Sequence, residues 1–225
     1  GPKIDCLGQN LPAFSQRKLP VCRCHRRGTP IAFMRIIAGK YRGRLLSTVH
    51  DLSIRPTTDR AKQTIFDILS NRLDFDGIDV LDLFAGSGSL GLEALSRGAK
   101  SVTFVEKVRT SIAVLEKNIA AIGCGDQVTI HPADVFWFLK NAHREYDLIF
   151  ADPPFNLETI GTIPAVVASS KAAREGTYVV LEYGKANPVS VSDKLYESVQ
   201  KQFGRTTVLI LKTLNPGTEH EGTPL

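Results

Sequence analysis

The sequence predicts an α/β fold in which helices cover both faces of a doubly wound, mostly parallel sheet. From Ile78 onward, apolar runs that suit buried strands alternate with segments of helical periodicity. The first run leads into a glycine-rich turn and a helix, as in nucleotide-binding βαβ units. The last two runs are joined by a short turn, so at least one of them should be antiparallel to the rest.

Each element follows from an apolar run or a helical period. The predicted strands cover residues 78–84, 101–106, 127–131, 146–151 and 176–183, and a terminal pair occupies 194–205 and 206–211. The predicted helices cover residues 89–97, 109–122, 135–142 and 158–172, and an earlier helix runs through Ile65 and Leu69 with Thr58 or Asp59 as its N-cap. Upstream, Ile36 to Val49 predicts a two-stranded hairpin with its turn near residues 39–43.

Length and charge restrict the classes of protein that this chain can be. Its 225 residues suffice for one sizeable core, and no stretch approaches the roughly 20 apolar residues of a membrane span. The formal net charge is +5, and residues 1–33 alone carry six basic residues against one acidic residue. The remainder is neutral overall, yet residues 35–62 hold seven basic residues against two acidic ones. A neutral body with one basic appendage indicates a nucleic-acid enzyme.

The first 33 residues differ in character from the rest of the chain. They open with Gly1-Pro2 and contain Cys6, Cys22 and Cys24, whereas a regular apolar pattern begins at Met34. We therefore expect residues 1–33 to be an added, upstream-translated or disordered leader, with an Arg-rich organellar leader as the alternative. Cys124 is the one cysteine of the body, which suits a reducing cytoplasm.

We expect four segments in all. Residues 34–54 should form a basic β-hairpin extension, residues 55–213 the catalytic domain, and residues 214–225 a flexible tail, in addition to the leader.

The glycine-rich turn and the strand after it predict a cofactor site. Val80–Gly91 reads as a strand, a turn with glycines that let a ligand approach the backbone, and a helix start. Glu106 ends the next strand and is suited to two ribose hydroxyls. Because Glu106 lies twenty positions after Gly86, the segment also matches the dinucleotide fingerprint, and an NAD-dependent dehydrogenase is the rival interpretation.

Three features favour S-adenosylmethionine over NAD. Asp82 ends the first strand, where it can order the site near the ligand's amino acid moiety and would repel a pyrophosphate. Asp134 follows the strand at 127–131 and is placed to read an adenine amine. The turn that begins at Asp152 supplies a methyl-acceptor site, which a hydride-transfer enzyme does not need.

The tetrapeptide Asp152-Pro153-Pro154-Phe155 follows the buried run 146–151, so it lies where a parallel strand ends and ligands bind. Two prolines fix φ and remove two N–H donors, which leaves carbonyl acceptors on a rigid turn. Asp152 and the Pro153 carbonyl can accept from a base amine while Phe155 stacks on the ring. The motif therefore predicts methylation of an exocyclic amine, although a stiff turn is the plainer interpretation.

With these motifs in order, Met34 to about Lys212 resembles the RsmD family of bacterial 16S rRNA guanine-N2 methyltransferases. The resemblance is carried by four motifs in sequence order: Arg42–Arg44, Arg55–Arg60, Asp82–Gly98 and Asp152–Phe155. One departure is visible, because the family usually has arginine and glutamate where this chain has Lys62 and Gln63.

The resemblance implies a class I S-adenosylmethionine-dependent methyltransferase: a Rossmann-like, seven-stranded sheet with a small N-terminal β-hairpin extension. It implies methylation of 16S rRNA within assembled or assembling 30S subunits. We also expect a cytoplasmic monomer that needs neither a metal ion nor a membrane. Catalysis is assigned to Asp152, Pro153 and Phe155. Cofactor binding is assigned to Arg55, Thr57, Asp82, Ala85, Gly86, Ser87, Gly88, Glu106, Lys107, Asp134 and Val135. RNA binding is assigned to Arg35, Lys40, Arg42, Arg44 and Arg60.

Other functions remain open on the sequence alone. An adenine-N6 methyltransferase acting on DNA or RNA uses similar strand-end motifs, although the body is too short for a separate target-recognition domain. A protein-glutamine methyltransferase would be expected to have Asn and Tyr in place of Asp152 and Phe155. A non-catalytic rRNA-binding assembly factor with the same fold is a further alternative.

Overall fold

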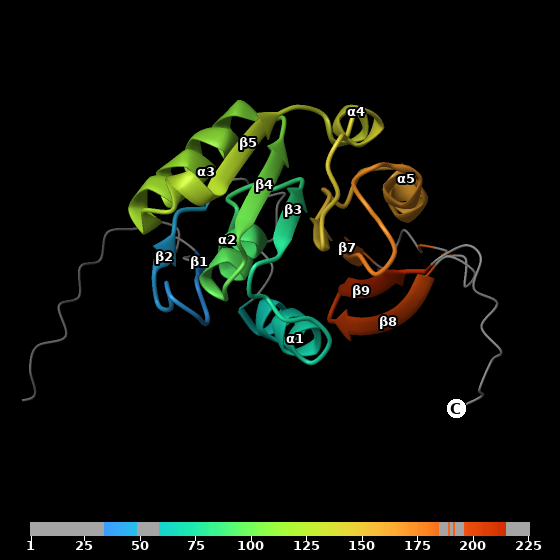
Figure 1. Ribbon diagram of the computed structural model, residues 1–225, viewed down its shortest axis with the longest axis horizontal. Helices are drawn as coiled ribbons and strands as arrows, with labels where there is room; N and C mark the ends of the chain where they lie inside the picture. Colours follow the sequence, from blue (N-terminus) through green and yellow to red (C-terminus); the bar gives the residue numbers. More distant parts are fainter. Residues whose placement is uncertain (1–33, 49–58, 185–188, 190, 192–195, 215–225) are drawn as a thin grey trace, which may run out of the picture. The chain divides into compact units, whose positions relative to one another are not determined.

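A computed structural model describes residues 34–48, 59–184, 189, 191 and 196–214 of the chain (Figure 1). The chain divides into the units Gly1–Ile31 and Ala32–Leu225, and every described residue belongs to the second. Within that unit, the predicted α/β class is confirmed by a seven-stranded sheet with helices on both faces.

The sheet has the strand order β5-β4-β3-β6-β7-β9-β8. Its strands are β3 (Asp79–Leu83), β4 (Ser101–Glu106), β5 (Val128–Pro132), β6 (Leu148–Ala151), β7 (Tyr178–Gly184), β8 (Tyr196–Phe203) and β9 (Thr206–Thr213). The first five are parallel, and β9 pairs antiparallel with both β7 and β8, as predicted. The chain builds outward from β3 to β5 and then returns to place β6 on the other side of β3. This switch point is where ligands bind in open α/β sheets.

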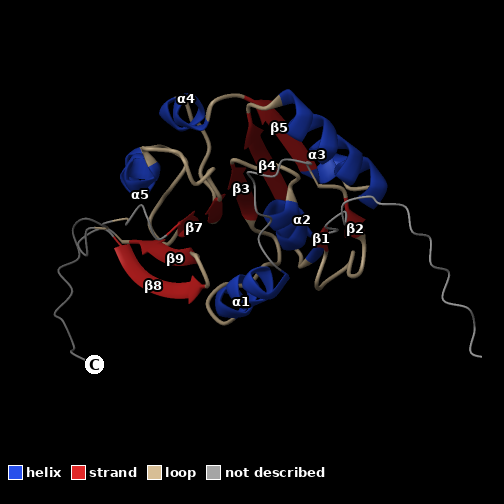
Figure 2. Ribbon diagram, turned by 180° about the vertical axis from the view of Figure 1, so that it is seen from behind, coloured by secondary structure: helices blue, strands red, loops and turns tan. Residues whose placement is uncertain are grey.

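The helices cover the two faces unequally (Figures 1 and 2). They are α1 (Asp59–Ser70), α2 (Ser89–Ser96), α3 (Arg109–Ile122), α4 (Val135–Lys140) and α5 (Ile163–Ser169), with 3₁₀ turns η1 (Gly125–Gln127) and η2 (Ile160–Thr162). Helices α1, α2 and α3 share one core with alternate strand residues such as Val80 and Phe150. Helices α4 and α5 share the other core with the intervening residues, such as Leu81 and Ile149. Alternation along each strand therefore feeds both cores.

Two predicted helices were too long. The helix predicted over 158–172 is reduced to α5, preceded by η2, because Pro164 suits the first turn of a helix and Ser170 is extended at its end. The helix predicted over 135–142 ends at Lys140, and Asn141 caps it.

The predicted hairpin is also shorter than expected. Strands β1 (Met34–Arg35) and β2 (Leu45–Leu46) pair over two residues each, with Met34 opposite Leu46. The turn lies where it was predicted, and one further pair of bonds follows the strands, from the Ile36 N–H to the Arg44 carbonyl and from the Gly43 N–H to the Ile36 carbonyl; the predicted end at Val49 lies outside the described residues. Beyond Ile36 the chain turns toward α2, where the N–H groups of Ile37 and Ala38 donate to the Glu93 carboxylate, at 2.7 and 3.0 Å.

The loop docks on helix α2 through hydrogen bonds. Besides the Glu93 contacts, Ser96 Oγ accepts from the Tyr41 N–H at 2.9 Å, and the Ser96 carbonyl accepts from the Lys40 N–H at 2.7 Å. Gly39 has φ +79°, and a Cβ there would lie 1.8 Å from the Ser96 carbonyl oxygen. The loop therefore approaches α2 too closely for any side chain at position 39.

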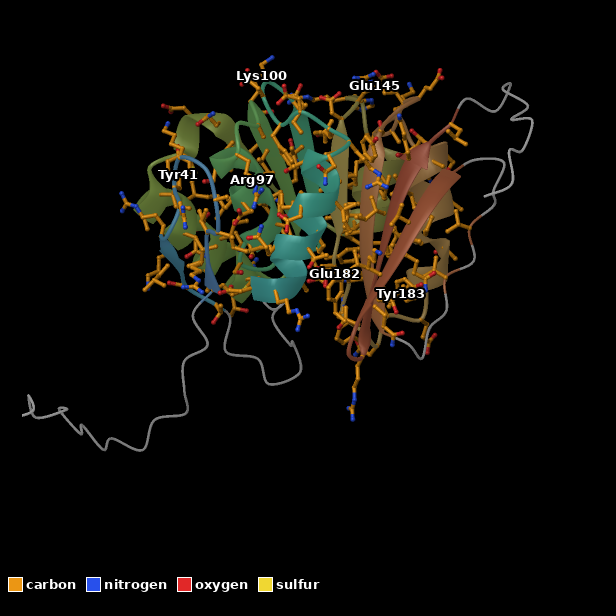
Figure 3. The ribbon with its side chains drawn as sticks, turned by 90° about the horizontal axis from the view of Figure 1, so that it is seen from below. Tyr41, Arg97, Lys100, Glu145, Glu182 and Tyr183 are labelled. Carbon is orange, nitrogen blue, oxygen red and sulfur yellow. The ribbon has the colours of Figure 1, made fainter. Side chains whose placement is uncertain are left out.

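Glu93 is fully buried and also binds two cations. Its carboxylate lies 3.4 Å from Lys62 Nζ on α1 and 3.0 Å from Arg97 Nε at the end of α2. The Arg97 guanidinium carbon lies 4.6 Å from the centre of the Phe66 ring on α1, and Figure 3 shows Arg97 between the hairpin and α1. Lys62 Nζ also donates to the Arg35 carbonyl at 2.6 Å. One carboxylate thus ties α1, α2 and the hairpin together.

We predict that Gly39→Ala destabilises the protein by about 2–4 kcal/mol, because a left-handed backbone and an overlap with Ser96 are both penalised. Gly43→Ala is the matched control: φ is +83°, yet nothing lies within 4 Å of its Cβ, so the cost should be about 1 kcal/mol. Urea unfolding followed by circular dichroism measures both. Equal losses in the two variants would contradict the close approach to α2.

Candidate active site

Three carboxylates gather at the carboxyl ends of β3, β4 and β6. Leu83 pairs with Val105 and with Ala151, so Glu106 and Asp152 come directly after its two neighbours in the sheet. Asp82, one residue earlier on β3, is 2% exposed and accepts from the Gly91 N–H at 2.9 Å. Burial raises the pKa of Asp82 well above its usual range, and the nearby Asp152 and Glu106 raise it further. The two carboxylates of Glu106 and Asp152 therefore lie beside a third carboxyl group that resists ionisation.

The glycines of the predicted cofactor turn have different tasks. Gly86 has φ +54°, and a Cβ there would meet nothing closer than the Phe84 carbonyl at 3.9 Å, so this part of the turn is open to a ligand. A Cβ on Gly88 would lie 2.4 Å from Leu115 Cδ1, which means that Gly88 is required for packing against α3. Of the other two residues assigned to this turn, Ala85 is buried, and the Ser87 carbonyl accepts from Asn118 Nδ2 at 2.9 Å.

Glu106 is 8% exposed and is held by three backbone donors. Its Oε2 accepts from Gly86, and its Oε1 accepts from Lys107 and Val108, at 2.8–2.9 Å. A carboxylate has about four acceptor positions, so one remains for a ligand. To bind both ribose hydroxyls as expected, Glu106 would have to accept from the second hydroxyl at a position that one of the backbone N–H groups already uses.

Asp134 is the N-cap of α4, which follows β5. It accepts from the N–H groups of Phe136 and Trp137 at 3.0 and 3.4 Å and pairs with Lys107 Nζ at 3.2 Å. Partial burial acts to raise the pKa of Asp134, but the hydrogen bonds from Lys107 and the two backbone groups outweigh it and hold this pKa below its usual range. The side chain of Val135, 3% exposed, belongs to the core.

The Asp152–Phe155 turn lies at the end of β6, on the other side of the switch point. Asp152 is half-buried, Pro153 is buried, and Phe155 is 39% exposed. The Pro154 carbonyl accepts from the Leu157 N–H at 2.9 Å, which closes the turn, whereas none of the described residues donates to the Pro153 carbonyl. The Phe155 ring lies beside Gly184 at the end of β7, where a Cβ would be 3.7 Å from its Cδ1.

The cations assigned to RNA binding lie on the hairpin and at the start of α1. Arg35 Nε pairs with Asp59 at 2.9 Å, and Lys40 Nζ lies 5.1 Å from the centre of the Tyr41 ring. Arg42, Arg44 and Arg60 are exposed. Arg55 and Thr57, assigned to the cofactor, lie outside the described residues.

The sequence did not predict the roles of three residues that support the site: Lys62, Glu93 and Asn118. Asn118 on α3 donates to the carbonyls of Ser47 and Ser87 and so links β2 to the cofactor turn. Lys62, at the position that departs from the family pattern, lies 3.3 Å from Ser89 Oγ at the start of α2 and pairs with Glu93. Gln63 instead donates to Asp67 within α1. A polar residue on a buried helix face was the available signal for Lys62, Glu93 and Asn118.

Two kinds of feature are absent from the described part of the chain. No helix there is both long and apolar enough to cross a bilayer. No group of three or more His, Cys, Asp or Glu side chains in the same residues is placed to hold a metal ion.

Comparison with known proteins places this geometry among relatives. The model of the family described as Conserved hypothetical protein 95 matches residues 34–212. Ribosomal RNA small subunit methyltransferase D of Haemophilus influenzae is 36% identical over 159 residues, which cover 69% of this chain and 81% of that protein. The structure of YhhF from Escherichia coli has a TM-score of 0.72 and 28% identity, and the match covers 81% of this chain and 99% of that one. The protein SMU.776, solved with SAH, has a TM-score of 0.55 over 68% of this chain and 49% of that one; at 18% identity it supports the fold alone.

The raised pKa of Asp82 predicts a pH dependence of stability. Between about pH 4, where an unfolded Asp titrates, and the higher pKa in the folded state, only the folded state holds the proton, so stability falls as the pH rises. The difference in free energy of unfolding between wild type and Asp82→Asn should therefore shrink as the pH rises above about 4.

Asp79, at the other end of β3, is the control with the opposite sign. Although partial burial opposes it, hydrogen bonds from Ser101 and Arg144 lower the pKa of Asp79, so its contribution should be lost as the pH falls below about 4. Urea unfolding across pH 3–8 separates the two variants. Parallel pH profiles for Asp82→Asn and Asp79→Asn would contradict this account of the strand ends.

Proposed function

We propose that this chain, which belongs to the RsmD family described as Conserved hypothetical protein 95, methylates the exocyclic N2 amine of a guanine in 16S rRNA. The methyl donor in this proposal is S-adenosylmethionine. The observation that carries the proposal is the Asp152–Phe155 turn, held at the switch point beside the open cofactor turn. An acidic oxygen, a fixed carbonyl and an aromatic ring at one strand end suit an amine on a flat base.

The residues present fit the proposed cofactor. S-adenosylmethionine supplies an electrophilic methyl group on a positively charged sulfonium and also carries an ammonium group. Glu106 and Asp152 make the edge attractive to such charges, whereas a dinucleotide pyrophosphate would be repelled. Gly86 would admit the ligand to the backbone, Glu106 would hold the ribose, and Asp134 with Lys107 would border the adenine.

The catalytic role of the turn follows from the chemistry of guanine. Its N2 lone pair is delocalised into the ring and is a weak nucleophile. Asp152 and the Pro153 carbonyl would accept the two N2 hydrogens and turn the lone pair toward the methyl carbon. The nitrogen would then form its bond to carbon as the carbon–sulfur bond breaks, and the excess proton would leave to Asp152 or to water. Positioning and electrostatics would supply most of the acceleration.

The target base must leave its stack to reach this turn, so it should lie in a loop or a distorted region of the rRNA. We assign the basic hairpin, residues 34–54, to phosphate contacts by Lys40, Arg42 and Arg44, and residues 55–213 to the methyltransferase domain. Arg35 and Arg60 would add contacts at the start of α1. Because these few cations offer a small contact area, we propose that the substrate is an assembled or assembling 30S subunit, whose proteins extend the contact. We further propose that the enzyme acts as a monomer in the cytoplasm.

The test of this function is the transfer of tritium from labelled S-adenosylmethionine to 30S subunits and to naked 16S rRNA from cells that lack the enzyme. We expect label in N2-methylguanosine after digestion to nucleosides, with more label on the particle. Label in N6-methyladenosine would favour the adenine-methylating alternative. Cofactor binding and RNA binding without any transfer would favour a non-catalytic assembly factor.

Asp152→Ala should lower the rate of transfer by about 10²–10³-fold, because one acceptor that orients the amine is lost. The affinity for S-adenosylhomocysteine, measured by calorimetry, should change little. Asp126→Asn, an exposed carboxylate in η1, is the control and should keep both. Loss of cofactor affinity together with activity in Asp152→Ala would contradict the role assigned to the turn.

A further inference from the structure

The chain has one tryptophan, and it is largely exposed to solvent. Trp137 on α4 is 62% exposed, the largest exposed fraction among the large hydrophobic side chains of the described residues. An exposed tryptophan leaves a wide apolar ring unburied, and tryptophan is enriched at binding interfaces. Its position on the fold indicates what it binds.

The backbone of Trp137 is fixed from both ends of α4. Asp134 accepts from its N–H, and its carbonyl accepts from Asn141 Nδ2 at 2.8 Å. Val135, Phe138 and Leu139 turn the other face of α4 into the core. The ring is therefore presented outward from a helix that does not need it for packing.

This helix borders the proposed active site. It follows β5 at the same carboxyl edge at which the Asp152–Phe155 turn follows β6. Helix α4 also packs against α5, which begins eight residues after Phe155 (Figure 1). A strand of nucleic acid whose target base enters at Phe155 would have α4 within reach along the same edge.

Exposed cations lie on α4 and on the loop that contacts its N-terminus. The Lys107–Asp134 ion pair joins α4 to the loop after β4, where Val108 is 47% exposed and Arg109 is exposed. Lys140, at the end of α4, is exposed as well. An aromatic surface among cations fits single-stranded nucleic acid, whose bases stack while its phosphates pair.

We propose that Trp137 is a stacking platform for an unpaired rRNA nucleotide that flanks the target guanine, with Arg109 and Lys140 as phosphate contacts. The proposal rests on the proposed function, since it takes rRNA as the substrate. It assigns to the far side of the cofactor edge a part of the RNA contact that the basic hairpin does not supply.

Because the chain has a single tryptophan, its fluorescence reports on this position alone. Titration with a single-stranded oligoribonucleotide of about eight nucleotides should quench the emission and reach saturation. Trp137→Ala has no tryptophan emission, so its affinity is measured by the fluorescence anisotropy of a dye-labelled oligonucleotide, with wild type measured in the same way. Trp137→Ala should bind the oligonucleotide roughly tenfold more weakly, as expected for the loss of one base–aromatic stack. Trp137→Phe should keep most of the affinity.

Two controls define the alternatives. Lys201→Ala removes an exposed cation from β8, at the opposite edge of the sheet, and should leave oligonucleotide affinity unchanged, whereas Lys140→Ala should weaken it. The affinity of Trp137→Ala for S-adenosylhomocysteine should equal that of wild type. Quenching by S-adenosylhomocysteine alone, with unchanged RNA affinity in Trp137→Ala, would show that the ring covers the cofactor and would overturn the proposal.

The nucleoside assay separates this inference from the proposed function. If wild type produces N2-methylguanosine, Trp137→Ala should raise the KM for 30S subunits more than it lowers kcat, and an unchanged KM would overturn the stacking role. If wild type methylates no guanine yet oligonucleotide quenches Trp137 and Trp137→Ala loses affinity, the proposed function fails, and with it the flanking-nucleotide assignment, while Trp137 stays a contact for single-stranded nucleic acid.

Discussion

The buried carboxylate of Glu93 is the interaction on which the arrangement of the N-terminal half depends. It accepts from two backbone N–H groups of the hairpin loop, pairs with Lys62 of α1, and binds Arg97 at the end of its own helix. Burying a carboxylate is tolerable only because each of these groups offsets its lost hydration. Removal of any one member would leave the others buried without compensation, and such breaks typically cost about 3–5 kcal/mol. The hairpin is therefore part of the cooperative unit and not a loose appendage.

Sequence patterns predicted the centre of the sheet because β3, β4, β6 and β7 are buried on both faces and read as continuous apolar runs. The same holds for the Asp152–Phe155 turn, whose two prolines and position after such a run leave few alternatives. The contacts of Glu93 and Asn118 with the hairpin were not predicted, since they join residues 55 to 71 positions apart, and local pattern contains no information on such pairings. The hairpin was extended too far for the same reason: past Ile36 the loop binds the side chain of Glu93, in another element, through the N–H groups of Ile37 and Ala38.

The active-site edge illustrates a conflict between stability and function. Asp82 is buried beside Glu106 and Asp152 at adjacent strand ends, and both burial and repulsion by these two carboxylates make it harder to ionise in the folded protein than in the unfolded chain. This arrangement opposes folding above acidic pH, yet it concentrates the field that a positively charged ligand requires. The cores on the two faces of the sheet supply the stability against which this repulsion is set.

Because the hairpin loop is held mainly through its backbone, its side chains can vary during evolution. Glu93 and Ser96 contact the loop through its main-chain N–H and C=O groups. At Gly39 the close approach to α2 leaves no room for a side chain. Docking of this kind does not depend on the identity of most loop residues. Arg42 and Arg44 can therefore be replaced during evolution without loss of the loop's position, so the surface that meets the substrate can diversify while the catalytic half of the molecule stays as it is.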